Sequence, residues 1–388
     1  MCSSDLLGAV HGLEVSSGFV VDIGGGSQEI SRFEDRRLVG SWTLPLGALR
    51  LSDRFLRSDP PRPDELDELQ DHATAALRDA GLGTIGADQQ VIGTGGTIRN
   101  LARVDRHIHP YPIPRLHGYV LDRGRIKHIG GLLASRKLVR RRRTPGLNPD
   151  RADSIVGGTL VALAFLDSVG ASHLVVSGEG LREGIALDTL TPDPPPVDVI
   201  REASIRSLVS RFSAWDRQRA ERRAGIAMQL LGSLRPEADP STRRRLADAA
   251  TVLDIGRSVD YYRRHRHAAD MLTEADLAGF SHRSLALLAA VVRNAGDEGS
   301  VWQAYRPILS SSDRGGVAEE GTMLALADEI EQRMPPGVVE GVACEDRRKS
   351  VVLTAPVFDP WRREALIRRF GRVFRKRLVI RDGGDGDA

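Results

Sequence analysis

The chain has 388 residues, of which 41% are hydrophobic and 28% charged, and its formal net charge is +3 at pH 7. This length predicts two or three domains, and the composition is that of a soluble globular protein. No apolar stretch is long enough to span a bilayer and no signal-peptide pattern is present, so we expect a cytoplasmic protein without a membrane partner. The two cysteines, Cys2 and Cys344, offer neither a metal-binding spacing nor a disulfide framework.

The first clear element is the stretch GFVVDIGGGSQEI at residues 18–30. An apolar run that ends in three glycines is typical of a central strand entering a tight turn. Glycines let the backbone approach an anion closely, and Ser27 adds a hydroxyl donor. Asp22 and Glu29 are carboxylates of the kind that Mg²⁺ prefers beside phosphate. The stretch suits a phosphate and metal loop, although a plain glycine-rich hairpin turn explains it equally well when it is considered alone.

Residues 33–51 alternate as a hairpin would, and a helix is predicted over roughly residues 64–80. Two more strand–turn–helix units follow, QQVIGTGGTIRNLARV at 89–104 and SHLVVSGEGLREGIALD at 172–188. In the first of them a helix is predicted to start near Thr97, and a helix N-terminus is a favourable place for phosphate. Between the two units, a helix that is apolar on most sides is predicted to be buried.

A proline cluster at 191–198 predicts a linker, and a break at 310–316 predicts a second boundary. The predicted domains are therefore 1–190, 191–310 and 311–388. The predicted helices after the linker are 200–215, 218–234, 241–255, 265–274 and 281–294, followed by helices near 318–333 and 360–371 and two strands in the tail. An arginine run at 136–143 could bind a nucleic-acid backbone, but we interpret it as a solvated helix face and expect no nucleic-acid partner.

Five motifs in order resemble the Ppx/GppA family of exopolyphosphatases and guanosine pentaphosphate phosphatases: VVDIGGGSQEI, LPLGALRLSDRF, VIGTGGTIRNLARV, PGLNPDRADSIVGGTLV and VVSGEGLREGIALD. The resemblance covers roughly residues 7–190. It implies an α/β lobe of the actin-like ATPase (ribonuclease-H-like) fold, then a helical HD-like domain and a small α+β C-terminal subdomain. It also implies release of terminal phosphate from inorganic polyphosphate or pppGpp with Mg²⁺, or alternatively Mn²⁺, by a homodimer.

The resemblance also implies roles for individual residues. Asp22 and Glu29 would lie near the metal or the attacking water, and Glu29 is the catalytic candidate. The phosphate-binding residues it implies are Gly24, Gly25, Gly26, Ser27, Gly93, Thr94, Gly95, Gly96 and Thr97, with Arg50 and Arg151 as electrostatic supports. These roles agree with the physics of phosphoryl transfer, which needs charge neutralisation and a placed water more than covalent help.

The sequence departs from the family pattern in two places. MCSSDL stands where the family has the glutamate segment that supplies the catalytic base, and Glu29 occupies a different place in its motif. We therefore expect an N-terminally truncated chain that lacks the first lobe and this base. In the helical domain, Leu253 stands where an HD site has histidine, and only Asp254 is kept. We expect a degenerate HD-like domain without a metal, in which His265 and His267 are surface or interface residues.

Two alternatives stay open. The missing base favours a non-catalytic protein that binds or senses polyphosphate or a guanosine alarmone. A sugar or acetate kinase relative would share the fold but would need an adenosine pocket. Nothing in the loops separates polyphosphate from pppGpp, although the many arginines between residues 201 and 266 lean weakly toward the polymer.

Overall fold

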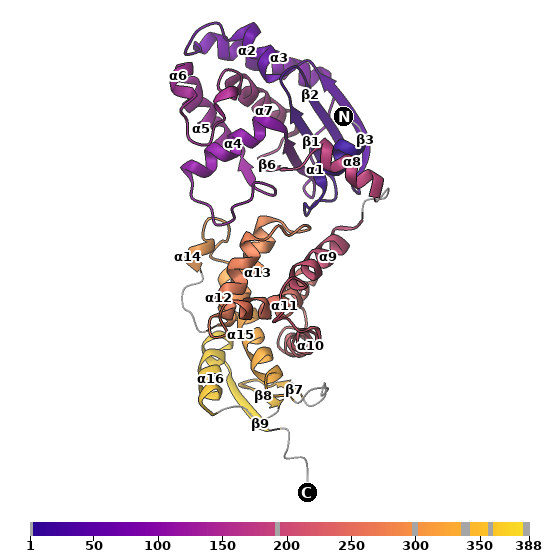
Figure 1. Cartoon of the computed structure of the whole chain (residues 1–388), viewed down its shortest axis with the longest axis vertical. Coiled ribbons are helices and arrows are strands. Elements are labelled where there is room, and N and C mark those ends of the chain that lie inside the picture. Colours follow the sequence, from indigo (N-terminus) through magenta and orange to yellow (C-terminus); the bar gives the residue numbers. More distant parts are fainter. Residues whose placement is uncertain (1–2, 191–194, 297–301, 335–341, 356–359, 383–388) are drawn as a thin grey trace. The chain divides into compact units, whose positions relative to one another are not determined.

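The structure is a computed structural model that describes residues 3–190, 195–296, 302–334, 342–355 and 360–382. The chain divides into two compact units (Figure 1). Unit 1 contains Met1–Arg201 and Ala278–Ser281, and unit 2 contains Glu202–Leu277 and His282–Ala388. None of the described helices has the length and apolarity that crossing a bilayer requires.

Unit 1 is built around a six-stranded sheet. Its elements are α1 (Ser3–Val10), β1 (Gly18–Ile23), β2 (Gln28–Glu34), β3 (Arg37–Leu44), α2 (Ala48–Phe55), α3 (Pro63–Asp79), β4 (Gln90–Thr94), α4 (Gly95–Ile108), β5 (Val120–Asp122), α5 (Arg123–Ala134), α6 (Leu138–Arg141), the 3-10 turn η1 (Pro149–Arg151), α7 (Ile155–Val169), β6 (His173–Val176) and α8 (Leu181–Leu190). The helix α9 (Val197–Val209) leads from unit 1 into unit 2.

The strand order is β3-β2-β1-β4-β6-β5. Strands β1, β4 and β6 run parallel, while β2 and β3 form an antiparallel hairpin beside β1 and β5 is antiparallel to β6. Positive φ angles at Asp35 and Arg36, 48° and 62°, turn the β2–β3 hairpin in the way that the twist of paired strands favours. The predicted hairpin over residues 33–51 is therefore confirmed up to Leu44, whereas residues 48–51 belong to α2.

Side chains of β1 alternate between two apolar layers because successive residues of a strand point to opposite faces. Phe19, Val21 and Ile23 enter the larger core, and Val20 enters a smaller one beneath α1. In the larger core the ring of Phe19 meets Phe165 of α7 edge to face, with centroids 6.3 Å apart. Burial on both faces explains why β1 is a nearly continuous apolar run.

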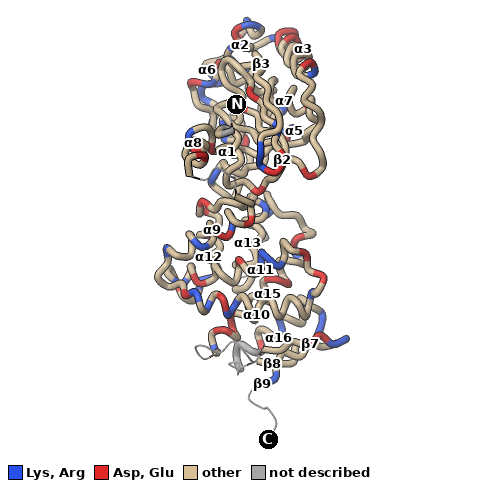
Figure 2. The backbone as a smooth tube through the Cα atoms, turned by 90° about the vertical axis from the view of Figure 1, so that its right-hand side faces the viewer, with Lys and Arg blue, Asp and Glu red and all other residues tan. Residues whose placement is uncertain are grey.

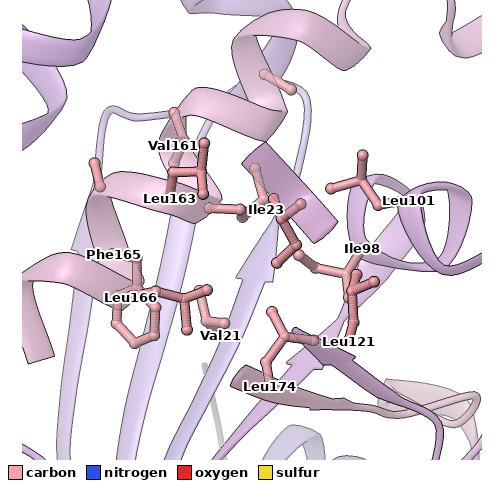
Figure 3. Packing of buried hydrophobic residues seen from close by; sticks show 14 of the residues in the cluster. Val21, Ile23, Ile98, Leu101, Leu121, Val161, Leu163, Phe165, Leu166 and Leu174 are labelled. Carbon is pink, nitrogen blue, oxygen red and sulfur yellow. The ribbon is translucent and has the colours of Figure 1, made fainter. Parts of the chain in front are cut away.

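Helix α7 supplies much of the larger core, as its apolar sequence predicts. Figure 3 shows Phe165 and Leu166 of α7 beside Val21, and Leu174 of β6 beside Leu121 of β5. The opposite face carries α1, which packs against α8 (Figure 1). These two helices approach so closely that a Cβ atom at Gly184 would lie 1.7 Å from the carbonyl oxygen of Ser4.

Three unit 1 helices were not predicted, namely α1, α2 and α5. Each of these helices is short. Helices α1 and α2 bury one face against the rest of the unit, so tertiary packing stabilises them more than their intrinsic helix propensity does. The arginine run at 136–143 was predicted to be a solvated helix face, and this is wrong in part. Only Leu138–Arg141 is helical, and Arg141 is buried, where its Nη2 donates to Asp59 at 3.0 Å.

Unit 2 consists of helices followed by a small sheet. Its elements are α10 (Arg217–Leu234), α11 (Pro240–Val252), η2 (Leu253–Ser258), α12 (Arg264–Glu274), α13 (His282–Ala295), α14 (Trp302–Tyr305), α15 (Asp313–Glu331), β7 (Ala343–Asp346), β8 (Ser350–Ala355), α16 (Pro360–Phe374) and β9 (Arg377–Asp382). The strand order is β7-β8-β9. Helix α15 begins just after the predicted boundary at residue 310, yet it packs against α10, α13 and α16, so the helical region and the tail form one unit.

Candidate phosphate-binding site

The three parallel strands of unit 1 end at the same edge of the sheet, and a glycine-containing segment follows each one. These segments are the loop Gly24–Ser27 after β1, the first residues of α4 (Gly95–Thr97) directly after β4, and the loop Ser177–Gly180 after β6. The carboxyl ends of parallel strands are the usual place for ligands in such sheets. The structure therefore brings together the loops that the sequence analysis found at three separate places in the chain.

The loop after β1 is a tight turn held against α2. The amide of Gly24 donates to the carbonyl oxygen of Ser27 at 3.0 Å. The first amides of α2 donate to loop carbonyls, from Ala48 to Gly24 at 2.8 Å and from Arg50 to Gly25 at 3.0 Å. The carbonyls of Gly24 and Gly25 are thus taken up by α2. Among the described residues, the amides of Gly25 and Gly26 donate to no backbone carbonyl, so they are available to an anion.

Gly47 makes this arrangement possible. A Cβ atom at Gly47 would lie 2.2 Å from the carbonyl carbon of Gly26, which no side chain could tolerate. Arg50, which the sequence analysis grouped with the phosphate site, lies on the first turn of α2 and its side chain is exposed.

The two carboxylates predicted to lie near a metal are cross-strand neighbours. Asp22 of β1 pairs directly with Glu29 of β2, and both residues are half-buried. The hydroxyl of Ser27 donates to Oε1 of Glu29 at 3.2 Å. Like charges placed directly opposite each other destabilise a sheet, and a cation between them would relieve this repulsion. Two carboxylates suit Mg²⁺, which completes its coordination with phosphate oxygens and water.

A metal site made from protein ligands alone is not found in the part of the chain that the structure describes. No group of three or more His, Cys, Asp or Glu residues in the described ranges is arranged to hold a metal ion.

The second turn joins β4 to α4, and its hydroxyl groups hold the loops together. Thr97 Oγ1 donates to the carbonyl oxygen of Ile23 at 3.1 Å, and Thr94 Oγ1 donates to the carbonyl oxygen of Glu179 at 3.1 Å. Gly93 is buried within β4, and its carbonyl oxygen accepts from the amide of Ser177 at 2.8 Å. In the segment Gly93–Thr97 that was predicted to bind phosphate, Gly93 and Thr94 thus belong to β4, and Gly95 and Gly96 are the first two residues of α4.

Two arginines of unit 1 lie at this turn. The guanidinium group of Arg151 lies against Gly96, since a Cβ atom there would be 3.1 Å from Cζ of Arg151. Arg99, which the sequence analysis did not select, donates from Nε to the carbonyl oxygen of Gly95 at 3.1 Å and from Nη1 to that of Gly178 at 3.3 Å. Its sequence signal is its position as the fifth residue of a helix that begins with two glycines directly after a strand.

Unit 2 contains the second sequence-predicted feature, the single Asp254 of the degenerate HD pair. Asp254 is buried, and its Oδ2 accepts from Nη2 of Arg223 at 2.5 Å. Arg223 is fully buried, with Nε 3.0 Å from Oδ1 of Asp328 and Nη2 3.7 Å from Oε2 of Glu331. Burial by itself lowers the pKa of Arg223, but the charges of Asp328 and Asp254 outweigh it and the pKa lies above its ordinary value.

His265 was predicted to be a surface or interface residue, and the structure contradicts the surface position. Only 14% of its side chain is exposed, and Nε2 lies 3.8 Å from Oδ2 of Asp328. Burial lowers the pKa of His265 to about 4, against the opposing effect of Asp328 and with a further contribution from Arg264. Figure 2 shows positive and negative residues interspersed along the helices of this unit, which is consistent with a network of ion pairs.

The sheet and the helical region together define the class of the protein. A mixed sheet with ligand-type loops at the carboxyl ends of its parallel strands, followed by a helical domain, is the arrangement of an actin-like ATPase lobe joined to a helical region. Family models agree with this class. The model of the Ppx/GppA phosphatase family matches residues 4–192, and the model of Ppx/GppA phosphatase, domain III, matches residues 200–333. The chain therefore belongs to the Ppx/GppA phosphatase family.

Individual relatives share less than a third of their aligned residues with this chain. Exopolyphosphatase 1 of Mycobacterium tuberculosis is 29% identical over 209 residues, which cover 53% of this chain and 60% of that protein. The chain thus spans 60% of the length of this curated relative. The crystal structure of the Aquifex aeolicus Ppx/GppA family member has 27% identity and a TM-score of 0.45, covering 50% of this chain and 63% of that one. An exopolyphosphatase structure from Cytophaga hutchinsonii has 22% identity and a TM-score of 0.40, covering 46% and 59%.

Proposed function

We propose that this protein is a phosphoanhydride hydrolase of the exopolyphosphatase type, which removes terminal phosphate from inorganic polyphosphate or from pppGpp. The observation that carries the proposal is the meeting of two anion-binding turns at one sheet edge. The free amides of Gly25 and Gly26 and the start of α4 at Gly95 lie on neighbouring parallel strands, with Arg151 against Gly96. Family membership and the exopolyphosphatase relatives point to the same chemistry.

Each group has a physical role in this reaction. Amides and Arg151 neutralise charge on the phosphoryl oxygens, which is the main requirement of phosphoryl transfer. Asp22 and Glu29 would hold Mg²⁺ or Mn²⁺, and such an ion would supply Lewis-acid stabilisation of the charge on the phosphate. Glu29, oriented by the hydroxyl of Ser27, is the carboxylate we assign to orienting the attacking water. A homodimer and a cytoplasmic location belong to the same proposal.

The proposal is tested by phosphate release from polyphosphate and, separately, from pppGpp, with Mg²⁺, with Mn²⁺ and with a chelator. The variant Gly25→Val is informative because a Cβ atom at Gly25 meets nothing closer than Cβ of Leu49 at 3.9 Å. The substitution should therefore keep the circular dichroism spectrum and abolish polyphosphate binding. Gly131→Val, at an open position on α5, is the matched control and should leave binding unchanged. Retained polyphosphate affinity in Gly25→Val would refute the loop assignment.

A second candidate function is binding without turnover, as in a polyphosphate or alarmone sensor. It is favoured by the engagement of both carboxylates, since Asp22 lies against Gly95 and Glu29 accepts from Ser27. Tight polyphosphate binding with no phosphate release in either metal would support the sensor, and metal-dependent release would support the hydrolase.

A further inference from the structure

Asn100 connects the second anion-binding turn to a distant segment of unit 1. It lies on α4, is 3% exposed, and uses both ends of its amide. Nδ2 donates to the carbonyl oxygen of Gly96 at 2.7 Å, and Oδ1 accepts from the backbone amide of Asn148 at 2.7 Å. A carbonyl oxygen can only accept and a backbone N–H can only donate, so the orientation of the Asn100 amide is unambiguous.

The segment that Asn100 holds leads directly to Arg151. Oδ1 of Asn148 accepts from the amide of Asp150 at 3.1 Å, and the amide of Arg151 donates to the carbonyl oxygen of Asn148 at 2.9 Å. Pro149 further restricts this single turn, η1. Fixing Asn148 therefore fixes the place from which the Arg151 side chain starts.

Arg151 brings positive charge to a place that is already positive. Its guanidinium group lies against Gly96 in the first turn of α4, where unpaired amides give the helix a partial positive charge. Within the described residues Arg151 makes no ion pair with a carboxylate. A half-buried cation beside a helix N-terminus, held there by a buried amide bridge, is an arrangement that an anion between them would complete.

We propose that Asn100 is a positioning residue for the anion site: it sets the distance between the Arg151 guanidinium and the amides that begin α4, so that one terminal phosphate group contacts both. This inference rests on the proposed function, and it adds a residue that touches neither substrate nor metal. It predicts that Asn100 acts through Arg151 and not independently of it.

A double-mutant cycle with tripolyphosphate as the probe tests this dependence. Affinity is measured by calorimetry in Mg²⁺ for the unsubstituted chain, Asn100→Ala, Arg151→Ala and the double variant. Loss of one charge-assisted hydrogen bond predicts that Arg151→Ala weakens binding by about 10- to 100-fold. Asn100→Ala should weaken it by about fivefold or more, and the double variant should bind within about twofold of Arg151→Ala alone.

Thr159→Ala is the control for general loss of stability. Its buried hydroxyl donates to the carbonyl oxygen of Ile155 on α7, and its removal should lower the melting temperature while leaving tripolyphosphate affinity unchanged. Losses that multiply in the double variant, or unchanged affinity in Asn100→Ala, would overturn the positioning role but leave the proposed function standing. Absence of binding to the unsubstituted chain would overturn both.

Discussion

Asp22 and Gly95 meet at the carboxyl edge of the unit 1 sheet, where a Cβ atom at Gly95 would lie 2.0 Å from Oδ1 of Asp22. Gly95 also has a φ angle of +82°, which side-chain-bearing residues rarely adopt. Glycine is therefore required at position 95 for two reasons: its backbone has a positive φ angle, and a side chain would collide with the carboxylate of Asp22. The consequence is that a carboxylate of β1 lies against the first residue of α4.

Replacing Gly95 by alanine should damage both stability and the site. We expect Gly95→Ala to lower the free energy of unfolding by about 1–3 kcal/mol from the backbone conformation alone, and to displace the Asp22 carboxylate. Denaturant unfolding and tripolyphosphate titration measure the two effects. The control Gly131→Ala lies in open space on α5, and it should be neutral or stabilising by about 1 kcal/mol. An equal response of the two variants would contradict the close approach.

The loops could be predicted from the sequence, whereas their contacts could not. An apolar run ending in glycines is a local signal, and β1, β4 and β6 lie where it indicates. The contact of Asp22 with Gly95 depends on the register of β1 against β4, in which Asp22 faces Thr94 across 72 residues of chain. The bridge from Asn100 to Asn148 is non-local in the same way, and an asparagine in a helix gives no sign of its partner.

The carboxylate pair of Asp22 and Glu29 predicts that Glu29→Gln changes the free energy of unfolding in opposite directions in a chelator and in Mg²⁺. In a chelator, Glu29→Gln should raise the free energy of unfolding by about 0.2–1 kcal/mol, because it removes a like charge opposite Asp22. In Mg²⁺ at 100 times its dissociation constant, the unsubstituted chain should gain about 2.7 kcal/mol. The variant should lose most of this gain. Denaturant unfolding in each buffer is the measurement, and equal stabilisation of both chains by Mg²⁺ would count against the site.

The buried arginine of unit 2 predicts a large and partly reversible loss of stability. Arg223→Met takes the close guanidinium partner from buried Asp254, while Asp328 keeps Arg264 at 2.6 Å, and breaking such a buried pair costs about 3–5 kcal/mol. Arg223→Met combined with Asp254→Leu removes the carboxylate that lost its close partner and should recover part of this loss. Urea unfolding of the unsubstituted chain, of Arg223→Met and of the double variant measures these changes in the free energy of unfolding. If Arg223→Met cost less than about 1 kcal/mol, the ion network would not be a structural centre.

Sequence reasoning missed this network for a physical reason. Arg219, Arg222 and Arg223 are alike in the sequence, and their exposures differ only because α10 turns Arg223 toward α11 and α15. Arginine is mostly exposed in folded proteins, so the sequence alone indicates a surface position. The burial of Arg223 becomes visible only in the packed helices of the structure. The side chain of His265 is likewise only 14% exposed, although a surface or interface position was expected for it.

His265 predicts a pH dependence of stability whose sign follows from its burial. The folded pKa of about 4 lies below the ordinary value of 6.5, so between these pH values the unfolded chain binds more protons than the folded chain. His265 therefore destabilises the fold progressively as the pH falls from about 6.5 to about 4. The groups that face it are Asp328, Arg264, Arg223 and Arg369. Burial raises the pKa of Asp328, but the charges of Arg223 and Arg264 outweigh burial and bring this pKa to about 2. The titration of Asp328 therefore affects stability below the pH window of His265.

His265→Gln isolates this contribution, since glutamine does not titrate and the other groups cancel in the difference. From pH 7 to pH 4 the unsubstituted chain should lose up to about 3 kcal/mol more stability than the variant, with a slope near 1.4 kcal/mol per pH unit inside the window. Urea unfolding at half-unit pH steps measures it. His267→Gln, two residues along the same helix, is the matched histidine-to-glutamine control that leaves His265 in place. Parallel stability curves for the chain and His265→Gln would show that His265 is accessible to protons in the folded state.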